Sequence, residues 1–368
     1  GTRAFARLFL VNTEATQTAN ISLNGGWFVN DLGNNDQTFT GNLTVTGTAD
    51  TNIIDLNDPG SQEQHLFTGV IGGTGGFSKI NTGAMILINN NTFQGNMYVQ
   101  RGRGTNLGSV HLSGVDGAVS AAAGVYVSRD GSVYLDNSVD VNSNRVSDAA
   151  DLILRGAGRM RFIGNGAAAV SESMGDYLVD TGSGRVNFDL DDTTPQNLTL
   201  TFASFNRNVG AVAQFQVLDN TPGAFGITAQ LHFTDAGASA TQFGGGGVNG
   251  STNMNLVVGA FGGVNDVSNH FMTFDSAAPT LLRPLDFSTE YLLSQNLVDG
   301  GVKHTLHQAT LGGVDQNVMI NYNTVRAIDP DPQIDWYAPN PIRVTENVGM
   351  NSLRFGTNTP TAGTNTNE

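Results

Sequence analysis

The stretch Leu198-Thr199-Leu200-Thr201-Phe202 decides the fold class of this chain. Apolar and polar residues alternate in it. Because successive side chains of a strand point to opposite faces, the pattern predicts a strand with one buried face. The alternation returns at residues 186–190 and 211–217, and Gly, Asn or Asp ends most such runs. Glycine and β-branched residues interrupt almost every segment long enough to form a helix, so we expect an all-β protein.

The spacing of the strands predicts how they stack. Comparable strand centres recur at Leu135, Leu154, Leu178 and Leu200, at intervals of 19 to 24 residues. An interval of that size is typical of one coil in a repeat architecture. An immunoglobulin-like sandwich would place turn signals every ~8–12 residues. We therefore expect a right-handed parallel β-helix, or β-solenoid, with loop excursions.

The pattern is uneven along the chain and predicts four regions. Residues 1–65 are expected to form solenoid coils with longer loops, and residues 66–263 a regular repeat module. Residues 264–341, which end in a proline-rich stretch, are expected to be an irregular excursion or a small embedded β element. Residues 342–368 are expected to start the next module and to end in a polar tail.

Composition narrows the classes of partner. Charged residues make up 13% of the 368 residues, about half the usual ~25%, and there are 47 glycines. The 17 basic and 32 acidic residues give a formal net charge of −15. An acidic surface repels phosphates and anionic lipid head groups, so we expect no nucleic-acid partner and no membrane insertion within this segment.

The absence of cysteine excludes disulfides, thiolate metal sites and cysteine catalysis. No apolar run approaches the ~18 residues of a membrane helix. The first residues do not have the pattern of a signal peptide, and the last ones are polar. We expect the chain to be a part of a longer polypeptide.

Two segments resemble a known repeat. Residues 69–79 combine a Gly-Val-Ile start with a glycine-rich turn and end in Lys79. Residues 86–96 continue with Ile-Leu-Ile and then Asn-Asn-Asn-Thr-Phe-Gln-Gly-Asn. This order resembles the autotransporter-associated β-strand repeat of bacterial surface proteins, with Phe93 at its aromatic position. The glycine pair that usually precedes the Leu-x-Leu strand is reduced to Thr-Gly-Ala at residues 82–84, a departure from that pattern.

Other segments resemble repeat modules of giant planctomycete-like surface proteins: residues 135–137, 144–148, 171–175, 205–211 and 351–355. The two resemblances together cover roughly residues 66–356. They imply a right-handed parallel β-helix, export from the cell, and an adhesive or structural role. They bring no catalytic residues with them.

Acidic residues at a strand end form the candidate metal site. Asp189, Asp191 and Asp192 follow the alternating run 186–190, and Asp329 and Asp331 lie in the proline-rich stretch. Ca²⁺ takes six to eight oxygen ligands from flexible loops. Neither the EF-hand spacing nor the calcium-binding nonapeptide repeat occurs. Solvated, turn-forming aspartates therefore remain the alternative to a calcium site at Asp189, Asp191 and Asp192, and no other cofactor is expected.

Other motifs favour structure over binding. The glycines of residues 72–76 lead into a strand, whereas a phosphate-binding loop precedes a helix, so they predict a tight coil corner. His304 and His307, three residues apart on a strand, would face opposite sides and could not share a metal. Asparagines also gather near strand ends, where they either mark turns or stack their amides from coil to coil. These are Asn137, Asn144, Asn165, Asn187 and Asn197.

An enzymatic role needs paired carboxylates, or a basic residue, at a set separation. Asp189 with Asp192 and Glu172 with Arg185 are the candidate pairs, and neither belongs to a recognisable motif. No Gly-x-Ser-x-Gly elbow occurs. The aromatic residues that could line a sugar surface are Trp27, Tyr322, Trp336 and Tyr337.

We expect a non-enzymatic structural module of a long extracellular bacterial surface fibre or adhesin stalk, exported to the cell surface. Stacked coils depend on their neighbours for hydrogen bonds, so we expect a homo-oligomer or filament built by end-to-end contact. A carbohydrate or cell-surface partner stays open. Two alternatives also stay open: a β-helix enzyme that degrades polysaccharide, and a viral coat or fibre protein.

Overall fold

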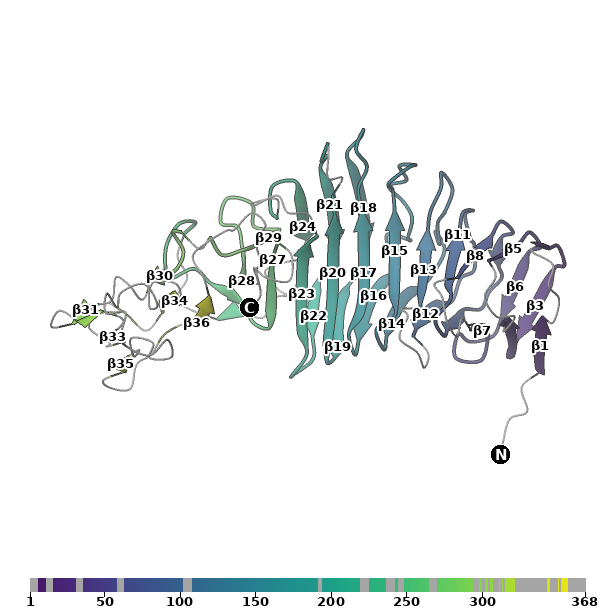
Figure 1. Ribbon diagram of the computed structural model, residues 1–368, viewed down its shortest axis with the longest axis horizontal. Coiled ribbons are helices and arrows are strands. Elements are labelled where there is room, and N and C mark those ends of the chain that lie inside the picture. The colour runs from purple at the N-terminus through teal and green to yellow at the C-terminus, as the bar shows by residue number, and fades with distance from the viewer. Residues whose placement is uncertain are drawn as a thin grey trace, which may run out of the picture.

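The structure is a computed structural model of the chain, and the elements labelled within its described residues, β1 to β36, are strands (Figure 1). It describes residues 6–10, 16–30, 36–57, 63–101, 108–190, 194–218, 225–235, 242–243, 248–264, 270–286, 288–293, 298–299, 302–303, 305–306, 311, 313, 315–321, 343–344, 350 and 352–356. Within these residues most strands pair in parallel and stack into a β-solenoid of about nine coils, which confirms the expected fold class.

Three faces make up the solenoid. The first face is a nine-stranded parallel sheet of β1 (Ala6–Leu10), β4 (Gly26–Asn30), β7 (Ile53–Leu56), β10 (Phe77–Ile80), β12 (Asn96–Gln100), β14 (Gly124–Ser128), β16 (Asp151–Arg155), β19 (Tyr177–Thr181) and β22 (Phe205–Arg207). The second face stacks β2 (Thr16–Gln17), β5 (Gln37–Phe39), β8 (Gln64–Phe67), β11 (Ala84–Leu87), β13 (Ser109–Leu112), β15 (Ser132–Asp136), β17 (Gly158–Ile163), β20 (Ser183–Asp189), β23 (Val212–Val217) and β27 (Ala260–Val264).

The third face is interrupted. Its first strands are β3 (Ile21–Asn24), β6 (Leu43–Thr46) and β9 (Ile71–Gly72), and its last are β18 (Val170–Met174), β21 (Leu198–Phe202) and β24 (Ala229–Phe233). Between these two groups the face has only the isolated parallel bridges Asn90↔Ala118 and Val119↔Val146. The middle coils are therefore held by strand ladders on two faces.

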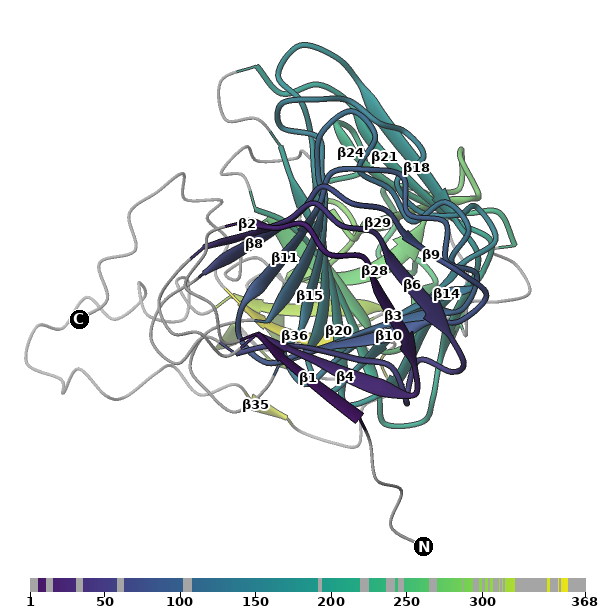
Figure 2. The same cartoon turned by 90° about the vertical axis from the view of Figure 1, so that its right-hand side faces the viewer.

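The solenoid is right-handed. Figure 2 looks at it from the N-terminal end, with the first face at the bottom, the second at the left and the third at the upper right. The chain visits the faces in that order, as β4, β5, β6 and then β7 do. It therefore turns clockwise as it recedes from the viewer, which is the handedness that parallel crossovers almost always take.

The core is a stack of inward-facing side chains, one from each coil. On the second face, Leu112, Leu135 and Phe162 are successive register partners, and all are fully buried. The stack continues through Phe188 and Val217. Burying each such side chain stabilises the fold by about 1.5–3 kcal/mol.

The coil spacing read from the sequence was wrong in its register. Leu135 pairs with Phe162, whereas Leu154 and Leu178 both lie on the first face and point to opposite sides of the sheet. Cross-coil hydrogen bonds in the later coils commonly span 28 residues, as between Asn165 and the Asn137 carbonyl. Coil length varies with the turns between strands: it is 20 residues between Phe77 and its partner Met97, and 29 residues between Ser183 and its partner Val212.

Two of the five asparagines singled out in the sequence, Asn137 and Asn165, bind backbone groups at coil corners. Asn137, fully buried, accepts hydrogen bonds at its side-chain oxygen from the Asn142 N–H and from Arg145 Nε, both at 2.9 Å. Asn165 Nδ2 donates to the Asn137 carbonyl one coil earlier at 2.9 Å. These side chains both shape turns and link coils.

Two antiparallel strands close the C-terminal end. β28 (His270–Phe274) pairs with β27 of the second face, and β29 (Leu281–Pro284) pairs with β24 of the third face. β28 and β29 also pair with each other, so the two faces join into one sheet. Phe233 fills the interior here, in contact with the rings of Phe202, Phe205 and Phe274.

The remaining strands form two- and three-stranded sheets apart from the three faces. They are β25 (Gln242–Phe243), β26 (Leu256–Val257), β30 (Leu292–Leu293), β31 (Val298–Asp299), β32 (Val302–Lys303), β33 (Thr305–Leu306), β34 (Asn317–Asn321), β35 (Arg343–Val344) and β36 (Ser352–Gly356). Most of the proline-rich stretch and the region that follows it lie outside the described residues. The four-region division stays a prediction.

Candidate functional site

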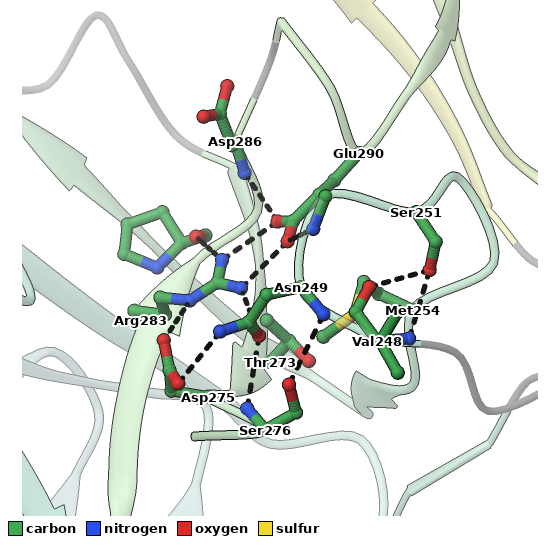
Figure 3. Close-up of polar contacts among 12 residues, drawn as sticks. Val248, Asn249, Ser251, Met254, Thr273, Asp275, Ser276, Arg283, Asp286 and Glu290 are labelled. Atoms are coloured by element: carbon green, nitrogen blue, oxygen red, sulfur yellow. Dashed lines mark hydrogen bonds and ion pairs between the residues drawn. The ribbon is translucent and has the colours of Figure 1, made fainter. Parts of the chain in front are cut away.

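A dense polar network lies beside the closing strands and centres on Arg283 of β29 (Figure 3). Its Nη1 and Nη2 donate to the two carboxylate oxygens of Glu290, each at 2.7 Å, and its Nε donates to Asp275 at 2.9 Å. Glu290 is buried, and Arg283 is largely so. A paired guanidinium and carboxylate in this geometry is among the strong protein hydrogen bonds.

All five N–H groups of the Arg283 guanidinium have an acceptor, because Nη1 also donates to the Pro284 carbonyl and Nη2 to Asn249 Oδ1. Burial acts to lower the pKa of Arg283, but the hydrogen bonds and charges of Glu290 and Asp275 outweigh it and raise that pKa. The network ties together turns near residues 249, 275 and 290. It works as a structural clamp, since its cation has no donor left for a ligand.

A second buried charge pair occupies a coil corner on the third face. Glu172 of β18 accepts hydrogen bonds from the backbone N–H groups of Arg145, at 2.9 Å, and Val146, at 3.2 Å. The Arg145 guanidinium is fully buried and donates to the carbonyls of Gly114, Gly117 and Asp140. Arg145 therefore fastens the backbone of two successive coils.

Burial changes the protonation of this pair. It raises the pKa of Glu172 to about 7, against the lowering effect of the two backbone hydrogen bonds and the Arg145 charge. Burial also lowers the pKa of Arg145, which nearby carboxylates partly offset. Glu172 therefore titrates near neutral pH, although it contacts no open surface.

Lys79 of β10 points into the solenoid. It lies in the inward row with Ile54 and Val99, and its side chain is fully buried. Its Nζ donates to the Asn81 carbonyl at 2.6 Å, while the Asn81 amide donates to Asp55. Burial lowers the pKa of Lys79 to about 7, and the charge of Asp55 limits that shift.

Aromatic rings stack along the outer surfaces. Tyr98 and Tyr126, register partners on the first face, have ring centroids 4.5 Å apart, and Arg155 lies over Tyr126 at 5.6 Å. On the second face His111 stacks on Tyr134 at 4.1 Å. Burial lowers the pKa of His111 to about 4. Neutral His111 thus behaves as another flat ring in the outer stack.

The predicted calcium ligands are only partly described. Asp189 ends β20, and its Oδ2 accepts hydrogen bonds from Arg161 Nε at 2.9 Å and Nη2 at 2.5 Å. Asp191 and Asp192 lie outside the described residues, so the calcium site stays a prediction. Among the residues that the structure does describe, no group of three or more His, Asp or Glu side chains could hold a metal ion.

The candidate enzymatic pair Glu172 and Arg185 is not brought together. Glu172 points into the solenoid from the third face, whereas Arg185 lies on the outer side of the second face and donates to Gln214 at 2.9 Å. In the other candidate pair, Asp189 is described but its partner Asp192 lies outside the described residues, as do His304, His307, Asp329 and Asp331.

Of the predicted sugar-surface aromatics, Trp27 is described. It lies on the outer side of β4, where the Arg7 guanidinium is 4.5 Å from its ring. Tyr322, Trp336 and Tyr337 lie outside the described residues.

The glycine-rich segment 72–76 forms the tight corner that the sequence predicts. It leads into strand β10, and Gly73 adopts a φ of 115°, in the region that favours glycine. A Cβ on Gly73 would lie 2.1 Å from the Val45 carbonyl oxygen of the preceding coil.

The described part of the chain has no helix long and apolar enough to cross a membrane.

Comparisons with protein-family models, with curated proteins and with solved structures find no match to this chain. The class of protein is therefore defined by the fold alone: a right-handed β-solenoid, closed at one end by an antiparallel pair of strands.

Proposed function

We propose that the chain is a structural module of a long extracellular bacterial surface fibre or adhesin stalk. The observation that carries this proposal is the continuous parallel pairing of the first face from β1 through β22, in which the register shifts once, between Leu154 and Arg155 of β16. Each coil there is hydrogen-bonded to the coils before and after it. Stability in such a stack is a sum over neighbouring coils, so the fold can be extended without a new core design.

Side chains add further links between coils. Thr194 Oγ1 donates to the Gly166 carbonyl at 2.7 Å, and Ser204 Oγ to Asp176 at 2.5 Å, each across 28 residues. Arg161 reaches Asp189 across the same interval. The buried groups Arg145 and Glu172 are likewise used in contacts between coils. This use of polar groups supports a role in which length and cohesion matter.

The extracellular part of the proposal is supported by the sequence. The resemblance of residues 69–79 and 86–96 to the autotransporter-associated β-strand repeat agrees with an exported surface protein. Immunogold labelling of intact source cells with an antibody against this chain tests it. Label on outer filaments is the expected result, and label confined to the cytoplasm would contradict the proposal.

The outer aromatic stacks favour a carbohydrate partner for the adhesin form of this role. The Tyr98–Tyr126 stack presents ring edges and hydroxyl groups beside Arg155, and amphipathic rings of this kind are common at binding surfaces. Calorimetric titration with neutral and acidic polysaccharides tests the binding. The same mixtures, assayed for new reducing ends, test whether the protein cleaves the polysaccharide. Cleavage would contradict the structural role and favour the alternative of an enzyme.

A further inference from the structure

Two tyrosines on the outer side of the first face are arranged for a reaction between their rings. Tyr98 of β12 and Tyr126 of β14 are register partners on successive coils. Their ring centroids are 4.5 Å apart and their planes differ by 12°. In an offset stack at this separation, the facing ring carbons of the two phenols lie near van der Waals contact. The fold therefore holds two oxidisable rings side by side.

The neighbours of the two rings in the same outward row cannot react in this way. The register partner of Tyr98 on the preceding coil is Ser78. The register partner of Tyr126 on the following coil is Ile153, and the Arg155 guanidinium lies 5.6 Å from the Tyr126 ring. None of these three side chains couples with a phenoxyl radical. A radical on Tyr126 therefore has Tyr98 as its reactive neighbour within the row.

The other described tyrosines have different surroundings. Tyr134 stacks on His111, with ring centroids 4.1 Å apart. Tyr177 is fully buried among phenylalanine rings, and Tyr291 is 3% exposed. Among the tyrosines that the structure describes, the stacked pair on β12 and β14 is thus the one whose rings contact each other. Both rings of this pair are partly exposed, so an oxidant in solution can reach them.

We propose that Tyr98 and Tyr126 form an oxidative cross-linking site, at which a peroxide-driven one-electron oxidant, such as a haem peroxidase, joins the two rings as dityrosine. Each phenol gives up one electron and one proton, and one molecule of hydrogen peroxide takes up both electrons and both protons to form two molecules of water. The two phenoxyl radicals then form a bond between the ring carbons next to their oxygens. The hydrogen on each of these carbons moves to the neighbouring oxygen, which restores both aromatic rings.

The bond reinforces the solenoid where its strand ladders are fewest. Between β9 and β18 the third face has only isolated bridges, and the coil that joins β12 to β14 lies in this part. The chain has no cysteine, so a disulfide cannot link these coils. A covalent link across a whole coil restricts the unfolded chain and so stabilises the fold. The inference adds such a link to the proposed structural role and does not depend on where the protein works.

Limited oxidation of the purified whole chain by a haem peroxidase and hydrogen peroxide tests the inference. Dityrosine is measured by its fluorescence, and mass spectrometry finds chains that have lost two hydrogen atoms and identifies the joined peptides. Tyr98→Phe and Tyr126→Phe each remove one reactive hydroxyl and keep the ring. Tyr134→Phe, whose ring stacks on His111, is the matched control. Oxidation of the parent chain in urea keeps the sequence and removes the register.

The parent chain and Tyr134→Phe are expected to give single chains with residues 98 and 126 joined, and with a higher melting temperature than before oxidation. Tyr98→Phe, Tyr126→Phe and urea should each lower the yield of this product at least tenfold. Circular dichroism should show the β spectrum of the parent in all three variants.

Three results would overturn the inference: no dityrosine in the folded parent chain, dityrosine mainly between chains or between other tyrosines, or a yield that Tyr126→Phe leaves unchanged. Each of them would leave the proposed structural role standing, because the stacked coils do not require the cross-link. A parent chain that proves to be a compact globule, and not a rod, would instead refute the structural role.

Discussion

Arg283 holds Glu290 through two hydrogen bonds of 2.7 Å, one to each carboxylate oxygen, where almost no solvent reaches the carboxylate. Removing the cation would leave a buried charge uncompensated. Arg283→Met is therefore expected to lower the free energy of unfolding by about 3–5 kcal/mol, measured by urea denaturation. Arg155→Ala, which breaks the more exposed pair with Asp180, should cost only about 0–1 kcal/mol.

The double variant Arg283→Met with Glu290→Leu separates charge from packing. Because it removes both charges together, it should be more stable than Arg283→Met alone. If the double variant is no more stable than Arg283→Met, the side chains of Arg283 and Glu290 stabilise the fold through packing and not through their charges.

Glu172 should make stability fall with rising pH. Burial raises its pKa from 4.5 to about 7, so the folded state holds this proton more tightly than the unfolded state does. The free energy of unfolding then decreases between pH 4.5 and about 7, by about 3 kcal/mol at 1.36 kcal/mol per unit. Urea denaturation across this window measures the slope. Glu172→Gln should remove it, and an unchanged slope in that variant would contradict the assignment.

Lys79 has the opposite effect in a different window. Burial lowers its pKa from 10.5 to about 7, so the folded state binds this proton less well than the unfolded state. Stability contributed by the neutral amine appears as pH rises from about 7 to 10.5 and is absent at lower pH. At roughly pH 6, Lys79→Met should raise the free energy of unfolding by up to about 5 kcal/mol. The loss of the hydrogen bond from Lys79 to the Asn81 carbonyl reduces this gain.

The Lys79→Met experiment has an internal control. Glu172→Gln should leave the pH dependence of the free energy of unfolding unchanged above about pH 7, because Glu172 affects stability between pH 4.5 and about 7. A Lys79→Met protein that is less stable than the parent at both ends of the pH range would show that the amine stabilises the core.

Phe233 is the central ring of the C-terminal core. It is fully buried, 5.5 Å from the Phe205 ring and 5.7 Å from the Phe202 ring. Phe233→Ala should lower the free energy of unfolding by about 3–5 kcal/mol, because it leaves a cavity where the last coil meets the closing strands. Calorimetry measures the loss, and Val209→Ala, on an exposed turn, should leave the melting temperature unchanged.

Local alternation predicted the strands well, and it failed to predict their register. Leu198, Leu200 and Phe202 are all fully buried, as period two requires. The same rule could not say that Leu154 and Leu178 lie on one face with opposite orientations, because the turns before them differ in length. The parallel partner of a residue is set by the length of a whole coil, and no short window contains that information.

The sequence analysis did not predict the buried charged residues within strands or the network around Arg283, and the reasons differ. Glu172 lies between Val170 and Met174 at the spacing of inward residues, so the alternation already indicates a buried carboxylate. Lys79 carries the same signal after Phe77. The Arg283 network gives no such signal, because its partners Asn249, Asp275 and Glu290 come from separate turns that only the fold brings together.

The parallel coil-to-coil register is the claim on which the rest depends, and cysteine pairs test it directly because the chain has no cysteine of its own. Ser173 and Thr201 are register partners on β18 and β21, with side chains on the outer surface. Ser173→Cys with Thr201→Cys should form a disulfide under mild oxidation, since neighbouring strands set Cα atoms within the range that the bond requires.

The control pair Ser171→Cys with Thr201→Cys uses the same strands two residues out of register. The account predicts rapid, nearly complete cross-linking of the first pair, read by mass spectrometry of the non-reduced protein, and little of the second. Equal cross-linking of both pairs, or faster cross-linking of the control, would contradict the stacked parallel coils.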